Sequence, residues 1–195
     1  MSEEQLVFAY HNGTLFSFER AYQHSASEFG GPLEVKLSGI EHGPKPLHFI
    51  AQLAAADLRL TPPRAPERGK LFTVPLIYGM CFDGCNIEYH VDVKGNIEIR
   101  EMRPTESSDD WPYRNYPLLL PYFPLQIGET RNCSYAEFAQ AFVNMPELQP
   151  ADLVVAVPTP VTLGISLWGR WTSAVTIVFE CDLSDRVVST YNVCD

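Results

Sequence analysis

Residues 86–93 read Asn-Ile-Glu-Tyr-His-Val-Asp-Val, and apolar side chains alternate with polar ones along this stretch. A period of two is typical of a strand that buries one face. Residues 97–102 largely continue the pattern after Lys94-Gly95-Asn96, and a three-residue loop there places Val93 opposite Ile97. That register keeps the apolar residues of both strands on one face, with Gly95 or Asn96 at positive φ. The stretch therefore predicts a β-hairpin.

Further strand signals lie on both sides of this hairpin. Residues 6–10 form a short apolar run, and residues 70–80 are rich in strand formers, with Pro75 indicating an edge strand or a bulge. Asp83-Gly84 is a tight-turn signal, so residues 70–93 are predicted to form a hairpin of their own. Three strands of a C-terminal meander are predicted at residues 161–168, 171–183 and 186–191.

Helix signals are fewer than strand signals. Ser134 and Glu137 have the spacing of a capping box, and the apolar residues of 135–143 then recur at helical intervals. Residues 18–27 are a second helix candidate, ended by Gly30-Gly31. Together these signals predict one α+β domain over residues 1–195, with antiparallel β-sheet and two or three helices packed on it.

Residues 29–78 carry the motifs of a known family. They contain Phe29-Gly30-Gly31-Pro32, then Pro-Leu-His-Phe-Ile-Ala-Gln-Leu at 46–53, and then Gly-Lys-Leu-Phe at 69–72. This segment resembles the YwqG-like family of bacterial proteins. The resemblance implies a mixed fold with antiparallel sheets, a strand over 49–53 and a short helical turn at 54–58. It carries over no catalytic residues, and it makes an immunity or antitoxin role a candidate function.

Charge and cysteine content narrow the class of protein. The 195 residues include 24 acidic and 14 basic side chains, which gives a formal net charge of −10. Nucleic acids and anionic membranes attract cationic surfaces, so neither is an expected partner. Five cysteines make an odd number without a disulfide spacing, and no apolar run is long enough to span a membrane. The acidic start is unlike a secretory signal, and we expect reduced thiols and a cytoplasmic location.

Residues 104–128 are unusually rich in prolines, aromatic residues and acids, and we expect a long irregular loop there. Aromatic side chains are enriched at protein interfaces, and acidic neighbours would attract a basic partner. The predicted partner-binding residues are Asp109, Asp110, Trp111, Tyr113, Tyr116 and Tyr122. The predicted function is a non-enzymatic module that binds a basic protein, such as a toxin domain. A second interpretation, in which these aromatic side chains fill the core, stays open.

Motifs for catalysis or cofactor binding are sparse. The sequence has no phosphate-binding glycine loop, no nucleophile elbow and no metalloprotease motif, so no cofactor is expected. Cys81 and Cys85 are separated by three residues, a spacing that two close zinc ligands can adopt, and His90 follows as a third candidate. Strand alternation, however, would turn the two thiols to opposite faces. These residues are the candidate metal ligands of the sequence. The alternative function is an enzyme or metal-binding protein with a Cys/His/Glu cleft at residues 81–92.

Overall fold

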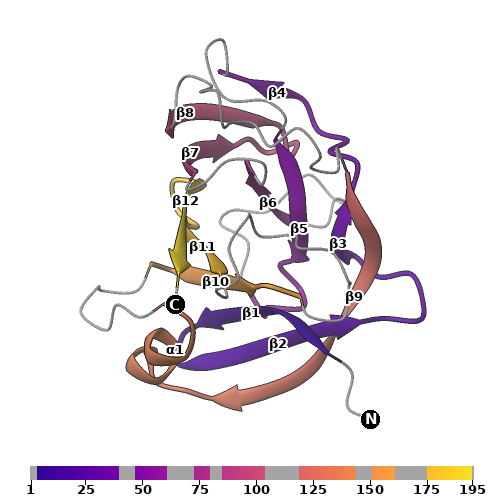
Figure 1. The fold of residues 1–195 in the computed structure, drawn as a ribbon, viewed down its shortest axis with the longest axis vertical. Coiled ribbons are helices and arrows are strands. Elements are labelled where there is room, and N and C mark those ends of the chain that lie inside the picture. The colour runs from indigo at the N-terminus through magenta and orange to yellow at the C-terminus, as the bar shows by residue number, and fades with distance from the viewer. Residues whose placement is uncertain are drawn as a thin grey trace.

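A computed structural model describes residues 4–39, 47–60, 73–79, 85–103, 119–143, 151–160 and 175–194. Across these ranges the chain is mostly β-strand, and the strands join in one twelve-stranded sheet (Figure 1). In chain order the elements are β1 (Gln5–His11), β2 (Thr14–Arg20), β3 (Ser27–Gly31), β4 (Leu37–Ser38), β5 (His48–Ala54), β6 (Thr73–Tyr78), β7 (Asn86–Val91), β8 (Ile97–Arg103), β9 (Leu120–Asn132), α1 (Tyr135–Phe142), β10 (Leu153–Pro158), β11 (Val175–Asp182) and β12 (Val187–Cys194).

Five of the eleven described strand pairs in the sheet join strands that are consecutive in the sequence, and the other six join more distant strands. Its spatial order is β4-β8-β7-β12-β11-β10-β1-β2-β9-β3-β5-β6. Each described strand pair is antiparallel except β4 with β8, which is parallel. The β1–β2 and β7–β8 hairpins have short connections, which favours their pairing, whereas eighteen residues separate β5 from β6. The pairing of β1 with β10 joins the N-terminal hairpin to the C-terminal strands.

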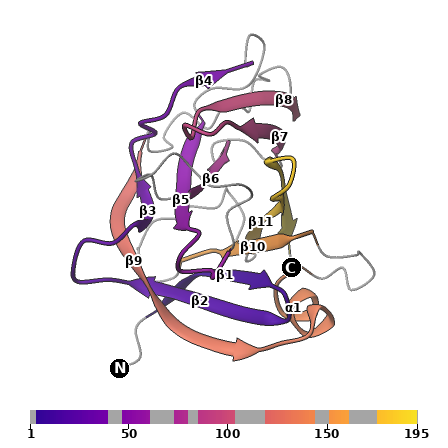
Figure 2. The ribbon, with the colours of Figure 1, turned by 180° about the vertical axis from the view of Figure 1, so that it is seen from behind.

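The sheet curls until its β6 end approaches β7, as the two opposite views show (Figures 1 and 2). The Tyr89 hydroxyl on β7 bridges the two strands. It donates to the carbonyl of Pro75 at 2.8 Å and accepts the N–H of Ile77 at 3.3 Å. Buried backbone groups without a partner are costly, so one tyrosine satisfies two polar groups that β6 presents away from β5.

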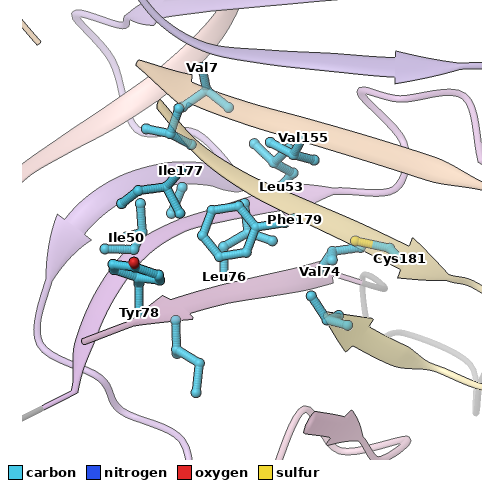
Figure 3. Close-up of a cluster of buried hydrophobic side chains, with 14 of the residues drawn as sticks. Val7, Ile50, Leu53, Val74, Leu76, Tyr78, Val155, Ile177, Phe179 and Cys181 are labelled. Atoms are coloured by element: carbon cyan, nitrogen blue, oxygen red, sulfur yellow. The ribbon is translucent and has the colours of Figure 1, made fainter. Parts of the chain in front are cut away.

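The main core lies inside the curl, between strands from distant parts of the sequence (Figure 3). Side chains of β1, β5, β6, β10 and β11 meet there, among them Val7, Ile50, Leu53, Val74, Leu76, Tyr78, Val155, Ile177, Phe179 and Cys181. Phe179 is fully buried within this cluster. Each square ångström of apolar surface removed from water contributes about 25 cal/mol, which makes this cluster the main source of stability.

A second, smaller core lies on the other face of the sheet under α1. The predicted capping box is confirmed: Glu137 N–H donates to the Ser134 hydroxyl, and the Glu137 carboxylate accepts the Ser134 N–H at 2.7 Å. The predicted apolar face of the helix is confirmed as well. Phe138, Ala139 and Val143 are buried against β1, β2, β10 and β11, and Tyr135 and Phe142 pack beside them.

The predicted α+β class is wrong. Within the described ranges α1 is the sole helix, and it is short, so the fold is a sheet protein. The helix expected at 18–27 is instead the end of β2, a connection and the start of β3. Residues 15–18 are all buried, because the inner core covers one side of β2 and the α1 core covers the other. Neither a strand period nor a helix period can appear in a segment buried on both faces.

Two further strand predictions are corrected. The 70–93 hairpin is wrong, because β7 pairs on its two edges with β12 and β8 and leaves no edge for β6. In the β7–β8 hairpin, Val91 rather than Val93 faces Ile97, and the three-residue loop is 93–95. The Asp92 carboxylate accepts the N–H groups of Lys94 and Asn96, which fixes the turn one residue earlier and leaves Val93 74% exposed.

The predicted strand at 49–53 and the turn at 54–58 are confirmed by β5 and by the backbone hydrogen bonds that follow it. Ser27 fixes this turn by donating to Asp57 at 2.6 Å and accepting the N–H of Ala54 at 2.9 Å. The strand predicted at 161–168 lies outside the described residues, whereas β11 and β12 confirm the last two strands of the meander.

Candidate functional site

Most of the predicted partner-binding residues, Asp109, Asp110, Trp111, Tyr113 and Tyr116, lie outside the described residues. Tyr122 is described, and its side chain is 48% exposed. The loop predicted to reach residue 128 is wrong at its end, because residues 120–128 belong to β9. This half of β9 pairs with β3 in spite of its two prolines, and the Pro124 carbonyl accepts the N–H of Ala21.

Two glycines position Tyr122. Gly30 has a φ of +64°, and a Cβ at this position would lie 2.1 Å from the carbonyl oxygen of Pro121. Gly31 has a φ of +83°, and a Cβ there would lie 3.1 Å from the ring of Tyr122. Glycine alone permits this backbone and this close approach of β9 to β3. The glycines predicted to end a helix therefore serve to seat the Tyr122 ring on the sheet.

One carboxylate contacts this tyrosine, and a second lies near the first. The Tyr122 hydroxyl donates a hydrogen bond to Glu28, which lies on β3. Burial raises the pKa of Glu28, the nearby Glu34 raises it further, and the Tyr122 hydrogen bond and His24 partly oppose that rise. Burial together with the Glu28 charge also raises the pKa of Tyr122. Two carboxylates that repel one another favour a cation between them.

We call this region the Glu28–Tyr122 surface, and its members are His24, Glu28, Glu34 and Tyr122. Tyrosine rings and carboxylates together can bind a lysine or arginine side chain, through the ring face and through charged hydrogen bonds. Sequence reasoning missed the two glutamates. The pair Gly30-Gly31 could have indicated them, since adjacent glycines mark a close approach of another strand.

Of the predicted Cys/His cleft, the structure describes Cys85 and His90 and does not bring these two side chains together. Cys81 lies outside the described residues. Cys85 is buried with Tyr89 on the core side of the strand, whereas His90 is half-buried on the opposite side. Side chains that leave a strand on opposite faces cannot bind one metal ion. In the described ranges, no three His, Cys, Asp or Glu side chains are close enough to hold a metal.

Two further cysteines have the properties of structural thiols. Burial raises the pKa of Cys181 far above its usual value, and it raises the pKa of Cys133 as well. A thiol nucleophile needs a lowered pKa, because the thiolate is the reactive form. Neither Cys133 nor Cys181 therefore has the environment of a catalytic cysteine.

No family model, curated protein or solved structure matches the chain. The resemblance to the YwqG-like family therefore depends on the motifs quoted above and stays a prediction. In the part of the chain that the structure describes, no helix is both long and apolar enough to cross a membrane.

Proposed function

We propose that this chain is a non-enzymatic binding module that docks a basic protein on its Glu28–Tyr122 surface. The observation that carries the proposal is the exposed Tyr122 ring, held on Gly31 and hydrogen-bonded to Glu28. A rigid tyrosine loses little conformational entropy on binding, which is why such residues dominate interfaces. The formal net charge of −10 would speed encounter with a cationic partner.

The surface also adjoins the predicted binding segment in the sequence. Tyr122 lies near the start of β9, directly after the acidic and aromatic residues 104–118. A partner that contacts Tyr122 would thus be close along the chain to Asp109, Asp110 and Trp111. A toxin domain is the class of basic partner that the family resemblance suggests. We place this interaction in the cytoplasm, because the buried thiols of Cys133 and Cys181 are suited to a reducing compartment.

The test compares three immobilised forms of the chain: wild type, a site variant and a matched control. The site variant carries Glu28→Gln, Glu34→Gln and Tyr122→Ala. The control carries Glu98→Gln, Glu101→Gln and Val93→Ala, which removes the same charge from exposed positions at β8 and its hairpin. Extracts of the source cells are passed over each form, and retained proteins are identified by mass spectrometry.

We expect wild type and control to retain a protein with a pI above about 9. The site variant should not retain this protein. The association rate of that purified protein should fall steeply with salt, since exposed charges are screened. Equal retention by the site variant would disprove the role of this surface, and so would a salt-independent association rate. Retention of acidic proteins alone, or of none, would contradict the whole proposal.

A further inference from the structure

A cavity of about 310 Å³ opens on the α1 face of the sheet, and it shares no lining residue with the Glu28–Tyr122 surface. Residues of β1, β2, β9 and α1 line it, namely Gln5, Phe8, Leu15, Ser17, Glu129, Arg131 and Phe142. Strand register explains how they meet. Phe8, Ser17 and Glu129 lie side by side across three strands, and Leu15 lies beside Arg131 in the next row. Alternation then turns all five side chains toward the same face.

One wall of the cavity is apolar. The rings of Phe8 and Phe142 stack with their centroids 4.3 Å apart, and Leu15 is buried beside them. The stack joins a strand to the last residue of the helix, so the wall is fixed by two elements. Small-molecule sites are mostly apolar with a few placed polar groups, and about 300 Å³ is the lower end of their volumes. The cavity therefore has room for one small molecule.

The other wall carries one negative and one positive side chain. Glu129 and Arg131 lie two residues apart on the exposed half of β9, so their backbones are about 7 Å apart along the strand. Within the described ranges neither side chain forms an ion pair. Arg131 does exert a longer-range attraction on Glu137, whose carboxylate is already bound by its own helix cap. Both charges thus remain available to a ligand.

Ser17 supplies a second, independent observation. The residue is 2% exposed, and its hydroxyl is buried without a hydrogen-bond partner. A buried hydroxyl that is left unpaired costs free energy, so native structures seldom keep one without a use. Gln5, on the same wall, adds an amide that can both donate and accept.

We propose that this cavity binds a free α-amino acid with an apolar side chain. Glu129 binds its ammonium group, Arg131 binds its carboxylate, and the side chain packs on the Phe8–Phe142 stack. A simple carboxylic acid or a simple amine would satisfy one of the two charges and leave the other without a partner. The inference does not depend on the proposed protein-binding function, since the two sites share no residue.

The experiment uses L-phenylalanine as the probe and follows backbone amide shifts by NMR titration. N-acetyl-L-phenylalanine lacks the ammonium charge, L-phenylalaninamide lacks the carboxylate, and L-serine lacks the apolar side chain. We expect L-phenylalanine to shift amides of residues 5–8, 15–17 and 129–131. Each of the other three compounds should bind at least about tenfold more weakly, which corresponds to about 1.4 kcal/mol.

Two variants then assign the charges. Arg131→Gln should weaken L-phenylalanine at least about tenfold but leave L-phenylalaninamide unchanged, because the amide has no carboxylate to lose. Glu129→Gln should likewise weaken L-phenylalanine at least about tenfold, and it should leave the binding of N-acetyl-L-phenylalanine unchanged, because that compound has no ammonium group. The matched controls, Arg100→Gln and Glu98→Gln on β8, should bind like wild type.

Three results would overturn the inference. The first is an absence of shifts with L-phenylalanine. The second is equal binding of the blocked compounds to the wild-type protein, which no folding defect of a variant can obscure. The third is full affinity in both Arg131→Gln and Glu129→Gln.

Discussion

The two faces of the sheet differ in how completely they are covered. The inner face is closed by the curl of the sheet, and its side chains from β5, β6 and β11 bury one another (Figure 3). The outer face is covered by α1 alone among the described elements. An eight-residue helix is about 12 Å long, whereas the thirteen residues of β9 span about 43 Å. The helix is therefore too short to cover the whole outer face of the sheet.

The two faces therefore differ in their expected roles. The inner face contributes apolar burial, and the buried Tyr89 hydroxyl there is satisfied by backbone groups of β6. The outer face leaves charged and aromatic groups side by side where α1 stops. A charged group beside an apolar surface stays hydrated while no ligand is bound, so it costs little free energy. A ligand that binds there excludes water, which strengthens its attraction to the charge. We therefore expect inner-face substitutions to affect folding and outer-face substitutions to affect binding.

Phe179→Ala should have the largest effect on stability of the substitutions considered. Removal of a fully buried phenylalanine leaves a cavity that the curled sheet cannot close, and such changes typically cost about 3–5 kcal/mol. We expect the free energy of unfolding, measured by urea titration, to fall by that amount. The control is Phe142→Ala, the same substitution at a half-buried outer position, which should cost clearly less. An equal loss at both positions would show that the two faces contribute alike.

The helix shows what the sequence predicts well. Its cap and its apolar face depend on residues within nine positions of one another, so the sequence contains the whole pattern. The β5 strand and its turn were likewise predicted, with the family resemblance as a guide. In contrast, residues 153–157 gave no periodic signal, because β10 is buried on both faces. The order of the strands depends on contacts such as β1 with β10, which local patterns do not contain.

The candidate sites were predicted less well than the fold. Tyr122 was among the predicted partner-binding residues, and that role stays a prediction, whereas its neighbour Glu28 comes from β3, almost a hundred residues earlier. Ser17, Glu129 and Arg131 are unremarkable in the sequence and meet only through the register of β2 with β9. The Cys85–His90 cleft was the opposite case. Its residues are close in sequence, yet strand alternation sends them to different faces.

Ser134→Ala tests whether α1 completes the outer face. Loss of a serine N-cap costs about 1 kcal/mol, and fraying of the helix would loosen Phe142 from Phe8. We expect a modest loss of stability by urea titration and a weaker response to L-phenylalanine. Ser134→Thr keeps the capping oxygen and should restore both. The expected loss of stability together with unchanged L-phenylalanine binding would contradict the role of the helix as a wall.

The same variant should alter the pH dependence of stability. The Ser134 side chain and then its N–H lower the pKa of Glu137 below its usual value. A lowered folded-state pKa stabilises the protein above the unfolded-state pKa, and this contribution disappears as the pH falls through the folded-state value. Wild type should therefore lose more stability than Ser134→Ala on acidification below about pH 4.5. Parallel pH profiles of the two proteins would argue against the predicted coupling.

Ser17→Ala should have the smallest effect on stability, and it tests directly whether a buried outer-face hydroxyl serves a ligand. Ser27 provides the matched reference, because it is 0% exposed and makes two hydrogen bonds, whereas the buried hydroxyl of Ser17 makes none. Ser27→Ala should cost about 1–3 kcal/mol, since it leaves the Ala54 N–H without its partner. Ser17→Ala should leave the free energy of unfolding unchanged or slightly higher, and it should weaken L-phenylalanine binding. If Ser17→Ala destabilised the protein as much as Ser27→Ala does, the Ser17 hydroxyl would serve the fold and not a ligand.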